Sequence, residues 1–114
     1  MSTINTDNIQ SQMKKGVLEF AILSIIQRGE AYPSDITSEL KESGMQVLEG
    51  TLYPLLTRLK NAGYLDYRWV ESTGGPPRKY FTMTETGNEF YKTLESTWNE
   101  ISRAVNKITN TNQL

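Results

Sequence analysis

Apolar residues in the first half of the chain recur at helical spacing and are interrupted by glycines. Between Met13 and Gln27 they cover more than half of the circumference of a helix, which predicts a helix buried against two surfaces that ends before Gly29. A second helix is predicted to begin near Tyr32–Pro33–Ser34, because proline suits a first turn, where its missing N–H has no helical partner. This helix closes at Gly44.

The next apolar set predicts a third helix over residues 51–61. Its leucines recur at i, i+3, i+4 and i+7, namely Leu52, Leu55, Leu56 and Leu59. With Thr51 as the N-cap, Pro54 falls in the first turn, and the opposite face presents polar and aromatic side chains such as Tyr53 and Arg58. Together with the second helix and the connection 44–50, this segment forms a helix-turn-helix pattern.

After the third helix, the period of the apolar residues changes from that of a helix to that of a strand. Leu65, Tyr67 and Trp69 alternate with more polar neighbours, which is typical of a half-buried strand. Residues 72–77 are rich in glycine and proline and predict the tip of a hairpin. The chain is then predicted to return as a strand from Arg78 to Met83.

The last predicted helix occupies residues 84–109. It begins at Thr84, or at Thr86, which forms a capping box with Glu89. Its apolar residues follow a period close to 3.5, and they are Phe90, Leu94, Ile101, Val105 and Ile108. This period suggests that two copies of the helix pair as in a coiled coil.

These elements predict a mainly α fold with a small β-hairpin (α+β). A winged helix-turn-helix domain over 13–83 is followed by a C-terminal dimerisation helix over 84–109, with a flexible tail at 1–12 and a second tail at 110–114. In a winged helix, one helix enters the major groove of DNA and the hairpin lies along the phosphate backbone. A small helical domain with a purely structural hairpin is the alternative.

The net charge of the chain does not favour DNA binding, but the distribution of charge along the sequence does. The formal net charge is −1, but residues 51–79 hold five cations against two carboxylates, or +3, and the remainder carries −4. Arg78 and Lys79 flank the predicted tip, where they are suited to phosphate contact. Arg58 fits either a DNA contact or a solvated helix surface.

The composition excludes several classes of chemistry. The chain has no cysteine and no histidine, which rules out disulfides, the common zinc sites and catalysis by those residues. The carboxylates match no calcium loop or catalytic pair, and prolines follow Gly74–Gly75 where a phosphate-binding loop would continue into a helix. We therefore predict no enzymatic activity, no cofactor and no metal. No apolar run could span a membrane and no signal peptide is evident, so we expect a cytoplasmic protein.

Trp98 lies on a second face of the last predicted helix, together with Tyr91. A large aromatic side chain there suits the centre of a dimer interface. It equally suits a plate on which a flat apolar ligand stacks. Both interpretations stay open on the sequence alone.

Several strings of residues resemble the PadR family of winged-helix transcriptional regulators, in its short branch with a single C-terminal helix. The most specific are Thr-Leu-Tyr-Pro-Leu-Leu at 51–56 and Gly-Pro-Pro-Arg-Lys-Tyr at 75–80. Shorter matching strings lie at 15–19, 29–36, 49–50, 63–65 and 84–87. The likeness covers residues 14–105.

The resemblance implies a homodimeric bacterial repressor that binds a palindromic operator in double-stranded DNA through helix 51–61 and a wing over 72–79. The DNA-contacting residues that it implies are Tyr32, Ser34, Thr51, Tyr53, Pro54, Arg58, Arg78 and Lys79. It also implies relief of repression by a planar aromatic effector between paired helices, at Phe20, Tyr91 and Trp98. The alternative is a protein–protein interaction module on the same scaffold, without specific DNA binding.

Overall fold

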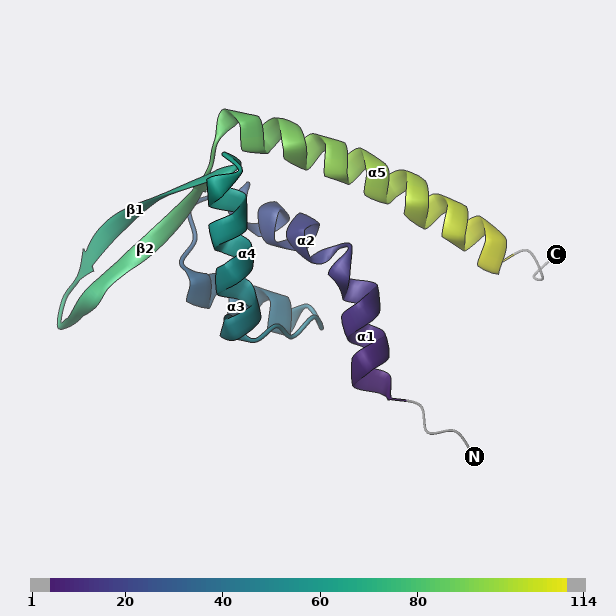
Figure 1. The fold of residues 1–114 in the computed structure, drawn as a ribbon, viewed down its shortest axis with the longest axis horizontal. Coiled ribbons are helices and arrows are strands. Elements are labelled where there is room, and N and C mark those ends of the chain that lie inside the picture. Colours follow the sequence, from purple (N-terminus) through teal and green to yellow (C-terminus); the bar gives the residue numbers. More distant parts are fainter. Residues whose placement is uncertain (1–4, 111–114) are drawn as a thin grey trace.

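The computed structural model describes residues 5–110, and this part of the chain contains five helices and one β-hairpin (Figure 1). Helices α1 (Thr6–Lys15), α2 (Leu18–Ile26), α3 (Pro33–Glu42) and α4 (Glu49–Asn61) come first. Strands β1 (Leu65–Ser72) and β2 (Gly75–Met83) form the hairpin, and α5 (Glu85–Thr109) follows. The hairpin projects from one side of the helical body, and α5 runs across the top of it (Figure 1).

The first helical segment is divided in two, where the sequence predicted one helix from Met13 to Gln27. The break falls at Gly16 and Val17, between α1 and α2. Helix α1 begins at Thr6, inside the segment expected to be a tail, because the Asn5 side chain caps it by accepting a hydrogen bond from the Asn8 N–H (3.0 Å). No residue of α1 is buried, so its start and end follow local capping and not the hydrophobic pattern.

Helix α3 begins and ends as predicted, whereas α4 begins two residues earlier than expected. The Leu48 carbonyl accepts the N–H groups of Thr51 (2.9 Å) and Leu52 (3.0 Å), so Leu48 is the N-cap and the prediction for Thr51 was wrong. Pro54 consequently lies inside the helix and not in its first turn. Because proline has no N–H, the Gly50 carbonyl receives no helical hydrogen bond from residue 54.

The hairpin is longer and its tip is tighter than the sequence predicted. Strands β1 and β2 pair antiparallel up to Ser72 and Gly75, which leaves Thr73 and Gly74 as a two-residue turn with Gly74 at φ 81°. The two prolines expected in the tip lie in β2 instead. Each strand of a two-stranded sheet has a free edge, where a missing N–H costs no ladder hydrogen bond.

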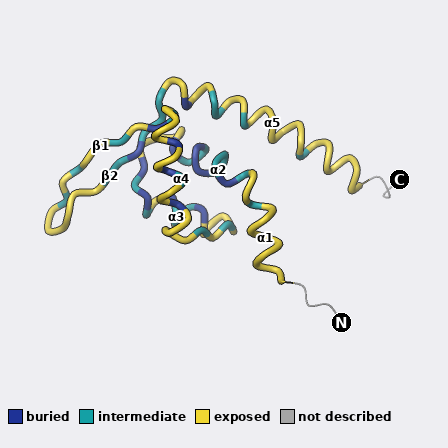
Figure 2. The backbone as a smooth tube through the Cα atoms, viewed as in Figure 1, coloured by how far each residue is buried: buried dark blue, intermediate teal, exposed yellow. Residues whose placement is uncertain are grey.

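The base of the hairpin is anchored to the helical body by backbone pairing. Ala31 and Phe81 exchange N–H···O hydrogen bonds of 3.1 and 2.9 Å. Burial decreases outward along β1, from Leu65, which is 2% exposed, to Trp69, which is 60% exposed (Figure 2). The outer half of the hairpin therefore lies beyond the core.

The core lies where α2, α3, α4 and the base of the hairpin meet (Figure 2). Its fully buried aliphatic side chains are Ile22, Leu23, Ile26, Ile36, Leu52, Leu56 and Leu59. The leucines that the sequence placed on one face of the third helix are the part of α4 that enters this core, with Leu55 partly buried at its edge.

The start of α5 is fixed to the end of α4 by the Thr84 hydroxyl. This group accepts the Gly87 N–H (2.9 Å) and donates to the Gly63 carbonyl (2.6 Å), so Thr84 and not Thr86 is the N-cap. Tyr64 and Phe90 stack with their ring centres 4.1 Å apart across the same joint. Gly87 is buried there, and a Cβ atom at this position would lie 2.0 Å from the Tyr64 carbonyl oxygen.

The two halves of α5 have different surroundings. Phe90, Tyr91 and Leu94 pack against the core, whereas Ile101 and Val105 are 53% and 49% exposed (Figure 2). In the part of the chain that the structure describes, no helix is long and apolar enough to cross a lipid bilayer.

Candidate nucleic-acid interface

A crevice of about 340 Å³ lies between the hairpin, α4 and the start of α3. Its lining combines cations with aromatic rings from three elements: Tyr32, Pro33, Ser34, Glu49, Tyr53, Trp69, Pro77, Arg78 and Lys79. Five of these belong to the predicted DNA-contacting set, namely Tyr32, Ser34, Tyr53, Arg78 and Lys79. The fold therefore brings together residues that lie far apart in the sequence.

Arg78 is held in the crevice by two contacts with the start of α3. Its Nη2 donates a hydrogen bond to Ser34 Oγ (3.1 Å), and its guanidinium carbon lies 4.3 Å from the centre of the Tyr32 ring. The Tyr32 ring in turn stacks on Tyr80, with ring centres 3.9 Å apart. These contacts direct the guanidinium without neutralising it.

Lys79 is placed by aromatic rings of the opposite strand. Its ammonium nitrogen lies 4.4 Å from the centre of the Tyr67 ring and 5.2 Å from that of Trp69. The two rings meet edge to face, 6.2 Å apart. Because ring faces attract a cation without cancelling its charge, Lys79 remains available to an anion.

The other cation of the hairpin, Arg68, is neutralised. Its Nη2 and Nε donate hydrogen bonds of 2.6 and 3.2 Å to the Glu30 carboxylate, and these bonds lower the pKa of Glu30 from its usual value. Within residues 5–110, neither Arg78 nor Lys79 forms an ion pair with a carboxylate. The free positive charge of the hairpin is therefore concentrated at residues 78 and 79.

Helix α4 presents its remaining predicted residues on different sides. At 3.6 residues per turn, Pro54 points away from the buried leucines, and Tyr53 points toward the hairpin. Thr51 and Arg58 lie on the opposite flank, where the Arg58 guanidinium forms an ion pair with Glu19 of α2. Arg58 therefore does not join Arg78 and Lys79 in the crevice.

Trp69 belongs to this site, although the sequence does not predict it there. The alternation of β1 predicts only a residue of a half-buried strand at this position, yet the side chain is 60% exposed and lines the crevice. The position of Trp69 in the sequence does indicate its exposure. It lies four residues beyond the buried Leu65, toward the tip of the hairpin and outside the core.

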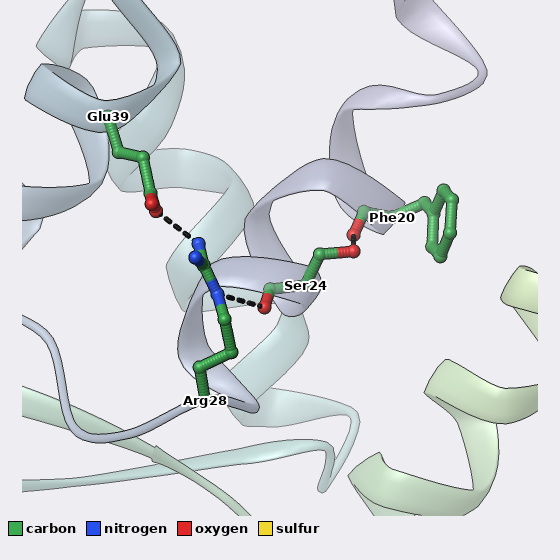
Figure 3. Close-up of polar contacts among 4 residues, drawn as sticks. All are labelled: Phe20, Ser24, Arg28 and Glu39. Carbon is green, nitrogen blue, oxygen red and sulfur yellow. Dashed lines mark hydrogen bonds and ion pairs between the residues drawn. The ribbon is translucent and has the colours of Figure 1, made fainter. Parts of the chain in front are cut away.

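The three residues predicted for an effector site also lie close together, away from the crevice, where α2 faces α5. Phe20 stacks against Tyr91 with ring centres 5.7 Å apart and lies 6.5 Å from Trp98. Figure 3 shows the Phe20 ring directed away from the polar contacts around it. The Ser24 hydroxyl donates to the Phe20 carbonyl, and Arg28, just beyond α2, donates to the Ser24 carbonyl and to the Glu39 carboxylate of α3. Trp98 is 42% exposed. Phe20, Tyr91 and Trp98 are called the aromatic cluster below.

Comparison with known proteins decides the family. The model of the "Transcriptional regulator PadR-like family" matches residues 22–93, from α2 into α5. This chain is a member of the PadR-like family of transcriptional regulators. The resemblance found in the sequence strings is thereby confirmed.

Solved PadR-like structures share the fold of the chain over most of its length. A PadR-like transcription factor from Bacteroides fragilis is 53% identical, with a TM-score of 0.75 over 89% of this chain and 98% of that one. A PadR-like regulator from Bacillus cereus is 37% identical, with a TM-score of 0.79 over 87% and 97% of the two chains. The predicted fold class, mainly α with a small β-hairpin in a winged helix, is confirmed.

A more distant PadR relative has been solved with DNA. The negative transcriptional regulator PadR of Bacillus subtilis is 32% identical over 76 residues, which are 64% of this chain and 42% of its own length. Its complex with operator DNA superposes with a TM-score of 0.63 and 29% identity, over 68% of this PadR-family chain and 45% of that one. The chain thus spans less than half of the length of Bacillus subtilis PadR.

Proposed function

We propose that this PadR-family regulator is a homodimeric repressor that binds a palindromic operator. One observation carries the proposal: the two free cations of the hairpin, Arg78 and Lys79, lie in the same crevice as the exposed side of α4. A helix that enters the major groove needs flanking cations on the adjacent phosphates, and this arrangement supplies both.

In the proposed complex, α4 occupies the major groove and presents Tyr53 and Pro54 to the base edges. Tyr32 and Ser34 face the phosphate backbone from the start of α3, and Arg78 and Lys79 contact it from the wing. Thr51 and Arg58 approach the duplex from the α2 side of the same helix. The operator complex of Bacillus subtilis PadR supports this docking by analogy of fold.

The dimer is proposed from the exposed apolar residues of α5. Ile101, Val105 and Ile108 are 53%, 49% and 74% exposed and continue the apolar stripe that begins in the core. A second copy of the chain that covers this stripe would hold two α4 helices at a fixed separation. Binding to one face of DNA requires a separation of one helical turn, about 34 Å.

Repression would follow from occlusion of a promoter by the bound dimer. Relief by a planar aromatic effector is proposed at the aromatic cluster, which lies between α2 and α5. An effector would weaken DNA binding only if it favoured a dimer in which the two α4 helices are wrongly spaced.

A selection of bound duplexes from a random-sequence pool, at moderate salt, tests the proposal. The selected sequences should converge on a palindrome, and a gel shift should retain the best of them over a shuffled duplex of the same composition. Recovery of unrelated sequences with equal affinity would instead identify a protein–protein module that binds DNA without preference.

A further inference from the structure

The outward face of α4 carries almost no charge. Gly50, Pro54 and Thr57 are spaced i, i+4 and i+7, which places them on one stripe opposite the buried Leu52 and Leu56. We call Gly50, Pro54 and Thr57 the outer stripe. The Tyr53 ring, 47% exposed, lies at its edge on the side of the hairpin.

The two cations of α4 lie on its two flanks, one on each side of the outer stripe. Arg58 is paired with Glu19 of α2, on one flank of the helix. Lys60 lies on the other flank in the last turn, with its ammonium 5.6 Å from the centre of the Tyr67 ring. All of α4 is within the described part of the chain, and no basic residue of it lies on the outer stripe.

The side chains of the outer stripe and Tyr53 suit contact with thymine methyl groups in the major groove, and they include no basic residue to contact guanine. The commonest specific contact to guanine is an Arg or Lys that donates to both O6 and N7, and the outer stripe offers neither residue. The Pro54 ring, the Thr57 methyl group and the Tyr53 ring are apolar surfaces of the kind that contact the C5-methyl group of thymine. Gly50 has no Cβ, and no heavy atom lies within 4 Å of where one would be. The helix can therefore come close to the bases at this point.

We infer that α4 recognises its operator through thymine methyl groups and not through guanine. The inference rests on the proposed function, because it presumes that α4 enters the major groove. Affinity then comes from phosphate contacts by the wing, through Arg78 and Lys79, and sequence preference comes from the apolar surface of α4. The residues that determine specificity are Tyr53, Pro54 and Thr57.

Modified DNA tests this inference without altering the protein. The probe is the duplex of highest affinity from the random-pool selection, resynthesised with deoxyuridine for thymine, which removes only the methyl group. We expect affinity to fall by about fourfold for each contacted methyl group, the cost of exposing one buried methyl-sized group. A second duplex with 7-deazaguanine for guanine lacks the N7 acceptor and should bind like the parent.

The outcomes separate the inference from the proposed function. If the deoxyuridine duplex binds as tightly as the parent, or if 7-deazaguanine is the change that weakens binding, the inference is wrong although the chain still binds DNA. If the unmodified selected duplex is not bound in preference to a shuffled one, the proposed function itself fails.

A conservative variant assigns one methyl contact to one residue. Thr57→Ser removes only the methyl group of that side chain and should reduce the deoxyuridine penalty at a single base position in each half-site. Thr93→Ser makes the same change on an exposed residue of α5 and is the matched control. Equal deoxyuridine penalties in Thr57→Ser and in the wild type at every position would remove Thr57 from the specificity-determining set.

Discussion

The guanidinium of Arg78 lies 4.3 Å from the ring centre of Tyr32, and it is also hydrogen-bonded to Ser34. The wing and the start of α3 are therefore joined through a cation that keeps its charge. Fixing a long side chain before binding reduces the conformational entropy lost when it meets a phosphate. The hairpin thus presents Arg78 in a preset direction, although its backbone projects beyond the core.

Replacement of both wing cations should reduce operator affinity and its dependence on salt. Each phosphate contact contributes about 0.9 to the slope of log affinity against log salt. In the proposed dimer, Arg78→Ala with Lys79→Ala removes about four such contacts, two from each copy, so the slope should fall by about 3.6. Fluorescence anisotropy over a range of salt concentrations measures it. Arg78→Lys should keep the slope but lose affinity, because lysine lacks the planar group that stacks on Tyr32.

The matched control for the wing variants is the ion pair between Arg68 of the same hairpin and Glu30, which lies between α2 and α3. Arg68→Ala with Glu30→Ala removes one charge of each sign and should leave the salt slope unchanged. A slope that stays the same without Arg78 and Lys79 would disprove the wing contact.

Charges placed on the exposed half of α5 should separate the proposed dimer. Ile101→Glu with Val105→Glu puts two carboxylates into the surface that a second copy would cover, and burying unpaired charge there is strongly unfavourable. Sedimentation at micromolar concentration should show a dimer for the wild type and a folded monomer for the variant. Ser96→Glu, on the opposite side of the helix, should remain a dimer. A monomeric wild type would contradict the proposal.

Planar aromatic compounds should quench the fluorescence of Trp98. The chain has two tryptophans, so Trp69→Phe leaves Trp98 as the sole tryptophan, which is excited selectively over tyrosine at long wavelength. Titration with planar dyes should then give saturable quenching, because a flat ligand stacks on the aromatic cluster. The same titration of Trp98→Phe, in which Trp69 is the only tryptophan, should show no saturable quenching. An unresponsive spectrum across a panel of dyes would leave Trp98 as a packing residue.

Gly87→Ala should destabilise the fold more than its small size suggests. The added Cβ would lie 2.0 Å from the backbone oxygen of Tyr64, which cannot move without shifting the end of α4. We expect the free energy of unfolding in urea to fall by about 1–3 kcal/mol, as for other overpacked sites. Gly50→Ala meets no atom within 4 Å and should be as stable as the wild type or more so. Equal stability of Gly87→Ala and the wild type would show that the joint is not tightly packed.

The elements that enter the core were predictable, because burial imposes a period on the sequence. The leucines of α4 and the alternation of β1 near Leu65 gave those elements the correct type. Local hydrogen bonds determine what the hydrophobic pattern does not predict: the break at Gly16, the N-cap of α1 at Asn5 and the N-cap of α4 at Leu48. Leucine is a poor N-cap side chain, so only the backbone reveals that position.

The part of the candidate site that lies close to the hairpin turn was predictable from the sequence. The ion pairs between different helices and strands were not. Arg78 and Lys79 stood out beside the tip of the hairpin. The pairing of Arg58 with Glu19 and of Arg68 with Glu30 joins segments distant in the sequence, and no local pattern signals it. Of the three cations in the hairpin, only Arg78 and Lys79 form no ion pair within residues 5–110.

The Thr84 hydroxyl holds both the end of α4, through Gly63, and the first turn of α5, through Gly87. Together with the Tyr64–Phe90 stack, these hydrogen bonds join α4, the proposed DNA-reading helix, to α5, the proposed dimer helix, at a fixed angle. If α5 tilts relative to α5 of the second copy, α4 should therefore rotate by a comparable angle. A change that loosens this joint should still allow the dimer to form and DNA to bind. The orientation of α5 in the dimer would then no longer determine the orientation of α4.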